Sequence, residues 1–193
     1  MKANRTLILN ALLLVVLLVS CKKEDNTPTP PTPPTIAIGE SYQGGKIAYI
    51  LQVGDIGYDA NVQHGLIAVE SDQGTAEWGC YGTEISGADS TAIGTGAQNT
   101  IDITNSCSQA GIASRLCGDL VLGGYSDWYL PSLDELNQLY INRVAIGGFA
   151  SNGYWSSSEL SSTFARIQYF GDGTQYYVSK FAGSASVRAV RTF

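Results

Sequence analysis

The residue types that most often carry enzyme chemistry are few in this chain and widely spaced. There is one histidine, His64, and the cysteines are Cys21, Cys80, Cys107 and Cys117. Because no CxxC or HxxxH spacing occurs, these residues form no zinc-binding pattern. The sequence contains none of the common catalytic or nucleotide-binding motifs GxSxG, P-loop, GxGxxG and HExxH. A Ser–His–Asp triad would have to use His64, and no nearby residue in the sequence completes such a triad. We therefore expect no catalytic activity, no bound metal or other cofactor, and a structural role for His64.

Two adjacent acids, Asp134 and Glu135, lie in the aromatic-rich stretch Gly123–Tyr140 and could suggest acid–base chemistry. Adjacent residues of a helix point in different directions, which disfavours a catalytic pair. The spacing of Ser132 and Glu135 instead matches a capping box, and both acids suit the positive end of a helix. We therefore predict a helix that starts after Ser132, with one apolar face formed by Leu133, Leu136, Leu139 and Tyr140.

The segment from Leu160 to Ser184 has the composition of a binding surface. Tyr and Phe offer large contact areas at little entropic cost, and Ser and Gly adapt to a partner. The candidate ligand-binding residues are Leu160, Ser161, Ser162, Phe164, Arg166, Tyr169, Asp172, Tyr176, Tyr177, Phe181, Ala182, Gly183 and Ser184. If Tyr176 and Tyr177 lie in one regular strand, they point to opposite faces, and only one of them can join a given surface.

The elements that must position these residues are short. Two predicted strands, Phe164–Phe170 and Thr174–Lys180, flank Gly171-Asp172-Gly173, whose residue types suit a tight hairpin turn. Helical spacing predicts helices over Ala97–Ser106 and Gln109–Leu120. Further strands are expected after Gly44, after Gly65, at Tyr154–Glu159 and at Val187–Phe193.

The cysteines of the domain are expected in an oxidising compartment, where disulfides persist. We favour a bridge between Cys107 and Cys117, which would join two successive predicted helices. Cys80 would then be free or buried, although a bridge that involves Cys80 stays open.

The N-terminal residues 1–20 have the pattern of a secretory signal peptide. Lys2 and Arg5 precede an apolar run from Leu7 to Val19. This run is shorter than the roughly 20 apolar residues that a membrane-spanning helix needs. Leu18-Val19-Ser20-Cys21 resembles the lipobox of bacterial lipoproteins, which implies cleavage before Cys21 and a lipid anchor on its thiol.

Residues 21–35 follow as a lipidated cysteine and a linker. Lys22-Lys23-Glu24-Asp25 resembles the short charged signal that sends some lipoproteins to the outer face of the outer membrane. Asn26–Thr35 is rich in proline and threonine, a composition typical of an extended, semi-rigid spacer. This layout predicts a domain at residues 36–193 that is anchored to a membrane and held away from it.

The composition of residues 36–193 limits the partners of this domain. Seven Lys and Arg stand against fifteen Asp and Glu, a net charge of −8. Nucleic acid requires a concentrated basic surface, so we exclude it as a partner. The length is sufficient for one domain with its own core, and the high glycine content favours strands and long loops over a helical bundle.

The motifs GGYSDWYLPSLDELNQLY, YWSSSE and VRAVRTF resemble, in their order and spacing, the Lcl C-terminal domain family over Gly44–Phe193. These domains are C-type-lectin-like and related to the formylglycine-generating-enzyme fold. The resemblance implies an α+β domain with two or three helices, one small twisted antiparallel sheet, long loops and neighbouring termini. It also implies that Trp128, Tyr129 and Trp155 fill the core. Lectin-like loops sometimes hold calcium, and the scattered acids leave calcium binding open.

The resemblance implies a ligand-binding or adhesion module at the cell surface, with an extracellular protein or glycan as partner. Some relatives are variable proteins of diversity-generating retroelements, whose C-terminal segment is rewritten at adenines. Between Leu160 and Ser186, residue types that an AAC codon cannot reach occur only at Gln168, Gln175 and Lys180. The alternatives are a structural subunit of a surface assembly and an enzyme of the formylglycine-generating type.

Overall fold

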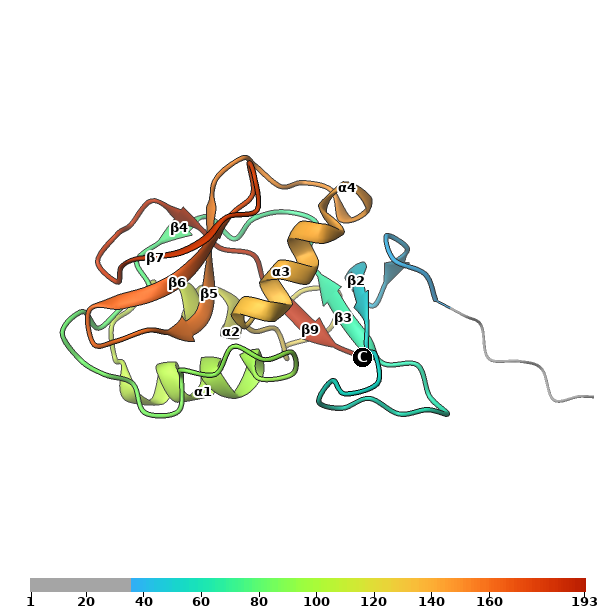
Figure 1. Ribbon diagram of the computed structural model, residues 1–193, viewed down its shortest axis with the longest axis horizontal. Helices are drawn as coiled ribbons and strands as arrows, with labels where there is room; N and C mark the ends of the chain where they lie inside the picture. The colour runs from blue at the N-terminus through green and yellow to red at the C-terminus, as the bar shows by residue number, and fades with distance from the viewer. Residues whose placement is uncertain (1–35) are drawn as a thin grey trace, which may run out of the picture. The chain divides into compact units, whose positions relative to one another are not determined.

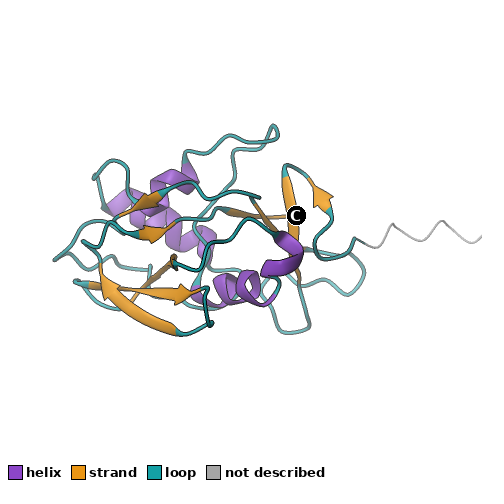
Figure 2. Ribbon diagram, turned by 90° about the horizontal axis from the view of Figure 1, so that it is seen from above, coloured by secondary structure: helices purple, strands orange, loops and turns teal. Residues whose placement is uncertain are grey.

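A computed structural model describes residues 36–193, which form a mixed α+β domain (Figures 1 and 2). The predicted signal peptide, Cys21 and the Pro/Thr-rich linker lie outside the described residues. The helices are α1 (Gly96–Ser106), α2 (Ala113–Gly118), α3 (Leu133–Ile141) and α4 (Arg143–Ile146). Between Ile36 and Phe193, none of these helices has the length and apolarity needed to cross a bilayer.

The strands form two sheets, where we expected one. The first sheet has the order β1 (Ser41–Tyr42), β2 (Gly45–Ile50), β3 (Gly65–Ala68), β9 (Val190–Thr192), all antiparallel. The second has the order β4 (Thr75–Ala76), β8 (Ala185–Ser186), β5 (Gly153–Glu159), β6 (Phe164–Tyr169), β7 (Gln175–Ser179), with a parallel pairing of β5 and β8. The segment from β8 to β9 passes from one sheet to the other, a long-range arrangement that local patterns do not encode.

The first and last strands of the domain are the two edge strands of the first sheet, and side chains near the two ends of the domain meet. The rings of Tyr42 and Phe193 meet edge to face, with 5.4 Å between their centroids. His64 belongs to the same corner, where its Nδ1 lies 3.0 Å from the carbonyl oxygen of Phe193. These contacts agree with a structural role for His64.

The helix predicted after Ser132 is α3, and its capping box is confirmed. The amide of Glu135 donates to Ser132 Oγ over 3.3 Å, and the amide of Ser132 donates to Glu135 Oε2 over 2.8 Å. Figure 1 shows α3 between the two groups of strands. Leu133, Leu136 and Leu139 are buried, as the spacing predicted, and Leu136 and Leu139 share an apolar cluster with residues of both sheets.

Two apolar clusters stabilise the domain. One lies around α1 and α2 and contains Trp78, Trp128 and Trp155. The other lies around α3 and contains Tyr129 and Tyr154. Trp128, Tyr129 and Trp155 are all buried, which confirms their predicted place in the core.

The helix expected at Gln109–Leu120 begins four residues later, at Ala113. Gly111 has φ +69°, a conformation that suits glycine and does not continue a helix. The guanidinium of Arg115 stabilises the intervening loop, because it donates to the carbonyls of Thr104 and Cys107 over 2.8 Å each and to that of Gln109 over 3.1 Å.

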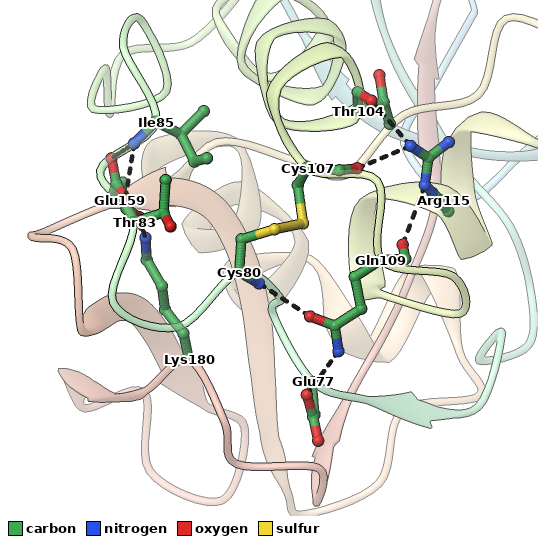
Figure 3. The surroundings of a disulfide bond; sticks show 10 residues. All are labelled: Glu77, Cys80, Thr83, Ile85, Thr104, Cys107, Gln109, Arg115, Glu159 and Lys180. Atoms are coloured by element: carbon green, nitrogen blue, oxygen red, sulfur yellow. Dashed lines mark hydrogen bonds and ion pairs between the residues drawn. A yellow bond between two sulfur atoms is a disulfide. The ribbon is translucent and has the colours of Figure 1, made fainter.

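The preferred disulfide between Cys107 and Cys117 is wrong. Cys107 pairs with Cys80, with 5.8 Å between their Cα atoms, and Figure 3 shows this bridge between the Cys80 loop and the end of α1. Cys117 is free and lies in the apolar cluster around α1 and α2, where burial raises the pKa of its thiol. The loop at Gly111 separates α1 from α2, and Cys107 lies outside both helices. Tertiary packing instead brings Cys80, which is 27 positions earlier in the chain, next to Cys107.

The buried cap of α3 predicts a pH dependence of stability. Burial raises the pKa of Glu135 to about 7, although hydrogen bonds from the amides of Ser132 and Gly94 lower it. Because the folded-state pKa exceeds the unfolded value, Glu135 contributes most stability below about pH 4.5, and this contribution is lost as the pH rises to about 7. Urea unfolding should therefore show a free energy of unfolding that falls over this range.

The matched variant for this test is Glu135→Gln, which cannot ionise and should flatten the dependence. Asp127 does not interfere, because its hydrogen bond with Arg191 lowers its pKa and moves its titration to more acid pH. An equal slope in the parent and in Glu135→Gln would contradict the assignment.

Candidate functional site

The candidate binding residues occupy the β6–β7 hairpin and the loops around it. Both strands lie within one residue of their predicted bounds. Arg166 is opposite Tyr177, and Ile167 is opposite Tyr176. Because opposed residues share a face and neighbours in a strand alternate, the hairpin has two differently composed faces. The candidates therefore do not form one surface.

Phe164, Arg166 and Tyr177 share one side of the hairpin, which we call the hairpin face. Phe164 and Tyr177 are 39% and 56% exposed, and their rings meet edge to face with 5.4 Å between centroids. Arg166 is half-buried, and its Nε is buried without a hydrogen-bond partner in residues 36–193. The face thus combines two accessible aromatic rings with a guanidinium that forms no hydrogen bond to any residue between Ile36 and Phe193.

Tyr169 and Tyr176 project from the opposite side of the hairpin. Tyr176 is 40% exposed, so both tyrosines of the Tyr176-Tyr177 pair reach solvent, but on different faces. The structure thus confirms the alternation expected from a regular strand. It also makes Tyr176 a natural control for experiments on Tyr177.

Several other candidates shape turns. Ser161 Oγ accepts the amide of Phe164 over 3.2 Å at the turn before β6. Asp172 Oδ1 accepts the amide of Thr174 over 2.8 Å in the hairpin turn, and this bond lowers the pKa of Asp172. The remaining candidates flank the strands, namely Leu160 and Ser162 before β6 and Phe181, Ala182, Gly183 and Ser184 after β7.

Strand β7 is the outer strand of the second sheet, and its far side is open within the described residues. The amide of Lys180 donates to the carbonyl of Thr163 over 3.0 Å. This bond fixes which residues of β7 form backbone hydrogen bonds with β6, because such residues alternate along an antiparallel strand. Tyr176 and Val178 therefore direct their backbone groups toward β6, and Tyr177 directs its N–H and C=O outward. Such an edge can pair with a further strand.

A buried ion pair that sequence reasoning missed fastens the hairpin to the Cys80 loop (Figure 3). Lys180 Nζ contacts Glu159 Oε1, and both side chains are buried. Lys180 Nζ also donates to the carbonyl of Thr83 over 2.8 Å, and Glu159 Oε2 accepts the amide of Ile85 over 2.9 Å. Charged residues at the ends of strands are usually exposed to solvent. The burial and pairing of Lys180 and Glu159 could therefore be recognised only in the tertiary structure.

The other basic residues near the core are also paired. Arg188 forms an ion pair with Asp72, and Arg191 forms one with Asp127. Arg166 takes part in no ion pair within the described residues. Arg166 is thus a cation on the hairpin face that has no ion partner within residues 36–193.

Acidic residues do not gather into a metal centre in the described part of the chain. Between Ile36 and Phe193, no three His, Cys, Asp or Glu side chains lie close enough together to hold an ion. Glu135 serves as a helix cap, and its neighbour Asp134 is partly desolvated, which raises the pKa of Asp134.

No protein-family model matches the chain, and no curated protein matches it either.

Proposed function

We propose that the chain is a surface-anchored lipoprotein whose C-type-lectin-like domain binds an extracellular protein through the hairpin face. One observation carries this proposal: Phe164, Arg166 and Tyr177 lie together on one face of the hairpin, and Arg166 has no ion partner within the described residues. Aromatic and arginine side chains contribute the largest share of binding energy at protein interfaces.

The open edge of β7 favours a protein as the partner. An extended segment can pair with the outward N–H and C=O of Tyr177 while its alternate side chains contact the hairpin face. An apolar side chain of that segment fits against Phe164 and Tyr177, and a carboxylate complements the guanidinium of Arg166. A glycan has no backbone amides with which to extend the sheet.

The anchoring part of the proposal is supported by the sequence. The apolar run that ends at Cys21 and the proline-rich linker would deliver the domain to a membrane and hold it at a distance. The net charge of −8 over residues 36–193 disfavours a polyanion such as a sulfated polymer as the partner, whereas a single carboxylate can pair locally with Arg166.

A displayed peptide library selected on the purified protein tests the binding face. The selected peptides should combine aromatic or aliphatic residues with acidic ones. We expect Tyr177→Ala and Arg166→Ala each to weaken binding of the best peptide about tenfold or more, because each removes an anchor from the face.

The matched control is Tyr176→Ala, which removes a similarly exposed tyrosine from the other side of the same strand. It should change affinity less than about twofold. Equal losses from Tyr176→Ala and Tyr177→Ala would reject the hairpin face. If the protein bound selectively to a glycan array and no peptide were selected, the proposal of a protein partner would be rejected in favour of a carbohydrate ligand.

A further inference from the structure

A pocket lies away from the hairpin face and shares no residue with it. It has a volume of about 470 Å³ and lies among α1, the end of α2 and the segment that precedes α3. Pockets of this size are typical of small-molecule sites. Ala97, Ile101 and Trp128 supply an apolar part of its wall, and Ile101 is exposed at the surface.

Two opposite charges line this pocket without pairing with each other. Arg115 and Asp119 are four residues apart at the end of α2, yet no ion pair joins them in the described structure. The Nε and Nη2 atoms of Arg115 are occupied by the carbonyls of Thr104, Cys107 and Gln109, as Figure 3 shows. These bonds fix the guanidinium in the wall, and its Nη1 has no hydrogen-bond partner in residues 36–193.

The carboxylate of Asp119 is exposed and has no hydrogen-bond or ion-pair partner between Ile36 and Phe193. The other acid of the wall, Asp127, differs, because both of its oxygens accept hydrogen bonds from Arg191, over 2.7 and 2.8 Å. The charges that remain for a ligand are therefore one positive group, Arg115, and one negative group, Asp119.

Trp128, which lines the pocket, is itself almost fully buried. Its side chain is only 2% exposed, and the indole Nε1 is buried without a hydrogen-bond partner in the described residues. A buried donor without a partner costs about 1–3 kcal/mol.

We propose that this pocket binds a free α-amino acid with an apolar side chain. The carboxylate of the ligand would accept hydrogen bonds from Arg115 Nη1, and its ammonium group would pair with Asp119. The apolar side chain would pack against Ala97, Ile101 and Trp128. An α-amino acid carries its ammonium and carboxylate groups on the same carbon atom, so one ligand can reach a cation and an anion that are one helical turn apart.

Calorimetry with L-leucine and the purified protein tests the proposal. We expect binding tighter than about 1 mM, with a change in tryptophan fluorescence because Trp128 belongs to the wall. N-acetyl-L-leucine, which lacks the ammonium charge, and L-leucinamide, which lacks the carboxylate, should each bind at least about tenfold more weakly. These ligand comparisons use the unmodified protein and do not depend on the folding of a variant.

The variant Asp119→Asn should also weaken L-leucine at least about tenfold, because it removes the partner of the ammonium group. Glu70→Gln makes the same change of charge at an exposed position outside the pocket and should leave affinity unchanged. No binding of L-leucine, equal binding of its acetylated form, or an Asp119→Asn variant with parental affinity would each overturn the proposal.

Discussion

Replacing Cys107 with serine is expected to lower the free energy of unfolding by about 3.5 kcal/mol, the chain-entropy value for a loop of this length. The bridge to Cys80 closes a segment with a sequence separation of 27, so its loss frees a long loop in the unfolded chain. Urea unfolding of the oxidised parent and of Cys107→Ser measures the difference. A reducing agent should bring the parent to the stability of the variant.

The comparison with Cys117→Ala distinguishes the observed pairing from the one that the sequence favoured. Cys117 is free, so its removal leaves the bridge intact and should cost only the contacts of one small buried side chain, about 1 kcal/mol. Cys117→Ala should still lose stability when a reducing agent is added. If it no longer responds to the reducing agent, the pairing of Cys80 with Cys107 is wrong.

Replacing Lys180 with methionine is expected to destabilise the domain by about 3–5 kcal/mol, because it leaves the buried carboxylate of Glu159 without its cation. Glu159 then retains the amide of Ile85 as a donor, which does not neutralise its charge. The aromatic ring of Trp78 also loses a cation that lies 4.6 Å from its centroid. Thermal and urea unfolding of the purified protein measure the effect.

Two variants make this second prediction specific. The double variant Glu159→Gln with Lys180→Met removes both charges and should recover part of the loss, because no unpaired charge remains buried. Lys46→Met serves as the control, since within the described residues the ammonium group of Lys46 donates only to Ser41 Oγ near the surface. It should change stability by less than about 0.5 kcal/mol. A Lys180→Met variant as stable as the control would show that the buried pair contributes nothing.

Both predictions concern the same corner of the domain. The disulfide joins the Cys80 loop to the end of α1, and Lys180 and Glu159 join that loop to the ends of β7 and β5 (Figure 3). The hairpin that carries Phe164 and Tyr177 is therefore joined to the Cys80 loop, which the disulfide in turn joins to α1. A rigid support of this kind reduces the entropy that a binding surface loses when it meets its partner.

The sequence by itself determined the features that depend on neighbouring residues. The capping box of Ser132 and Glu135, the apolar face of α3 and the hairpin around Gly171–Gly173 were all predicted. So was the alternation of Tyr176 and Tyr177. Each of these depends on helical or strand periodicity, or on side-chain-to-backbone bonds between residues a few positions apart.

Only the tertiary structure decided which distant residues meet. The division into two sheets depends on pairings such as β3 with β9, and the partner of Cys107 is a loop residue that no spacing rule selects. Burial of Lys180 and Glu159, and the unpaired charges of Arg115 and Asp119 around one pocket, likewise follow from packing between separate elements. Such contacts are set by the free energy of the whole core, to which local propensity contributes little, so a single sequence carries no direct record of them.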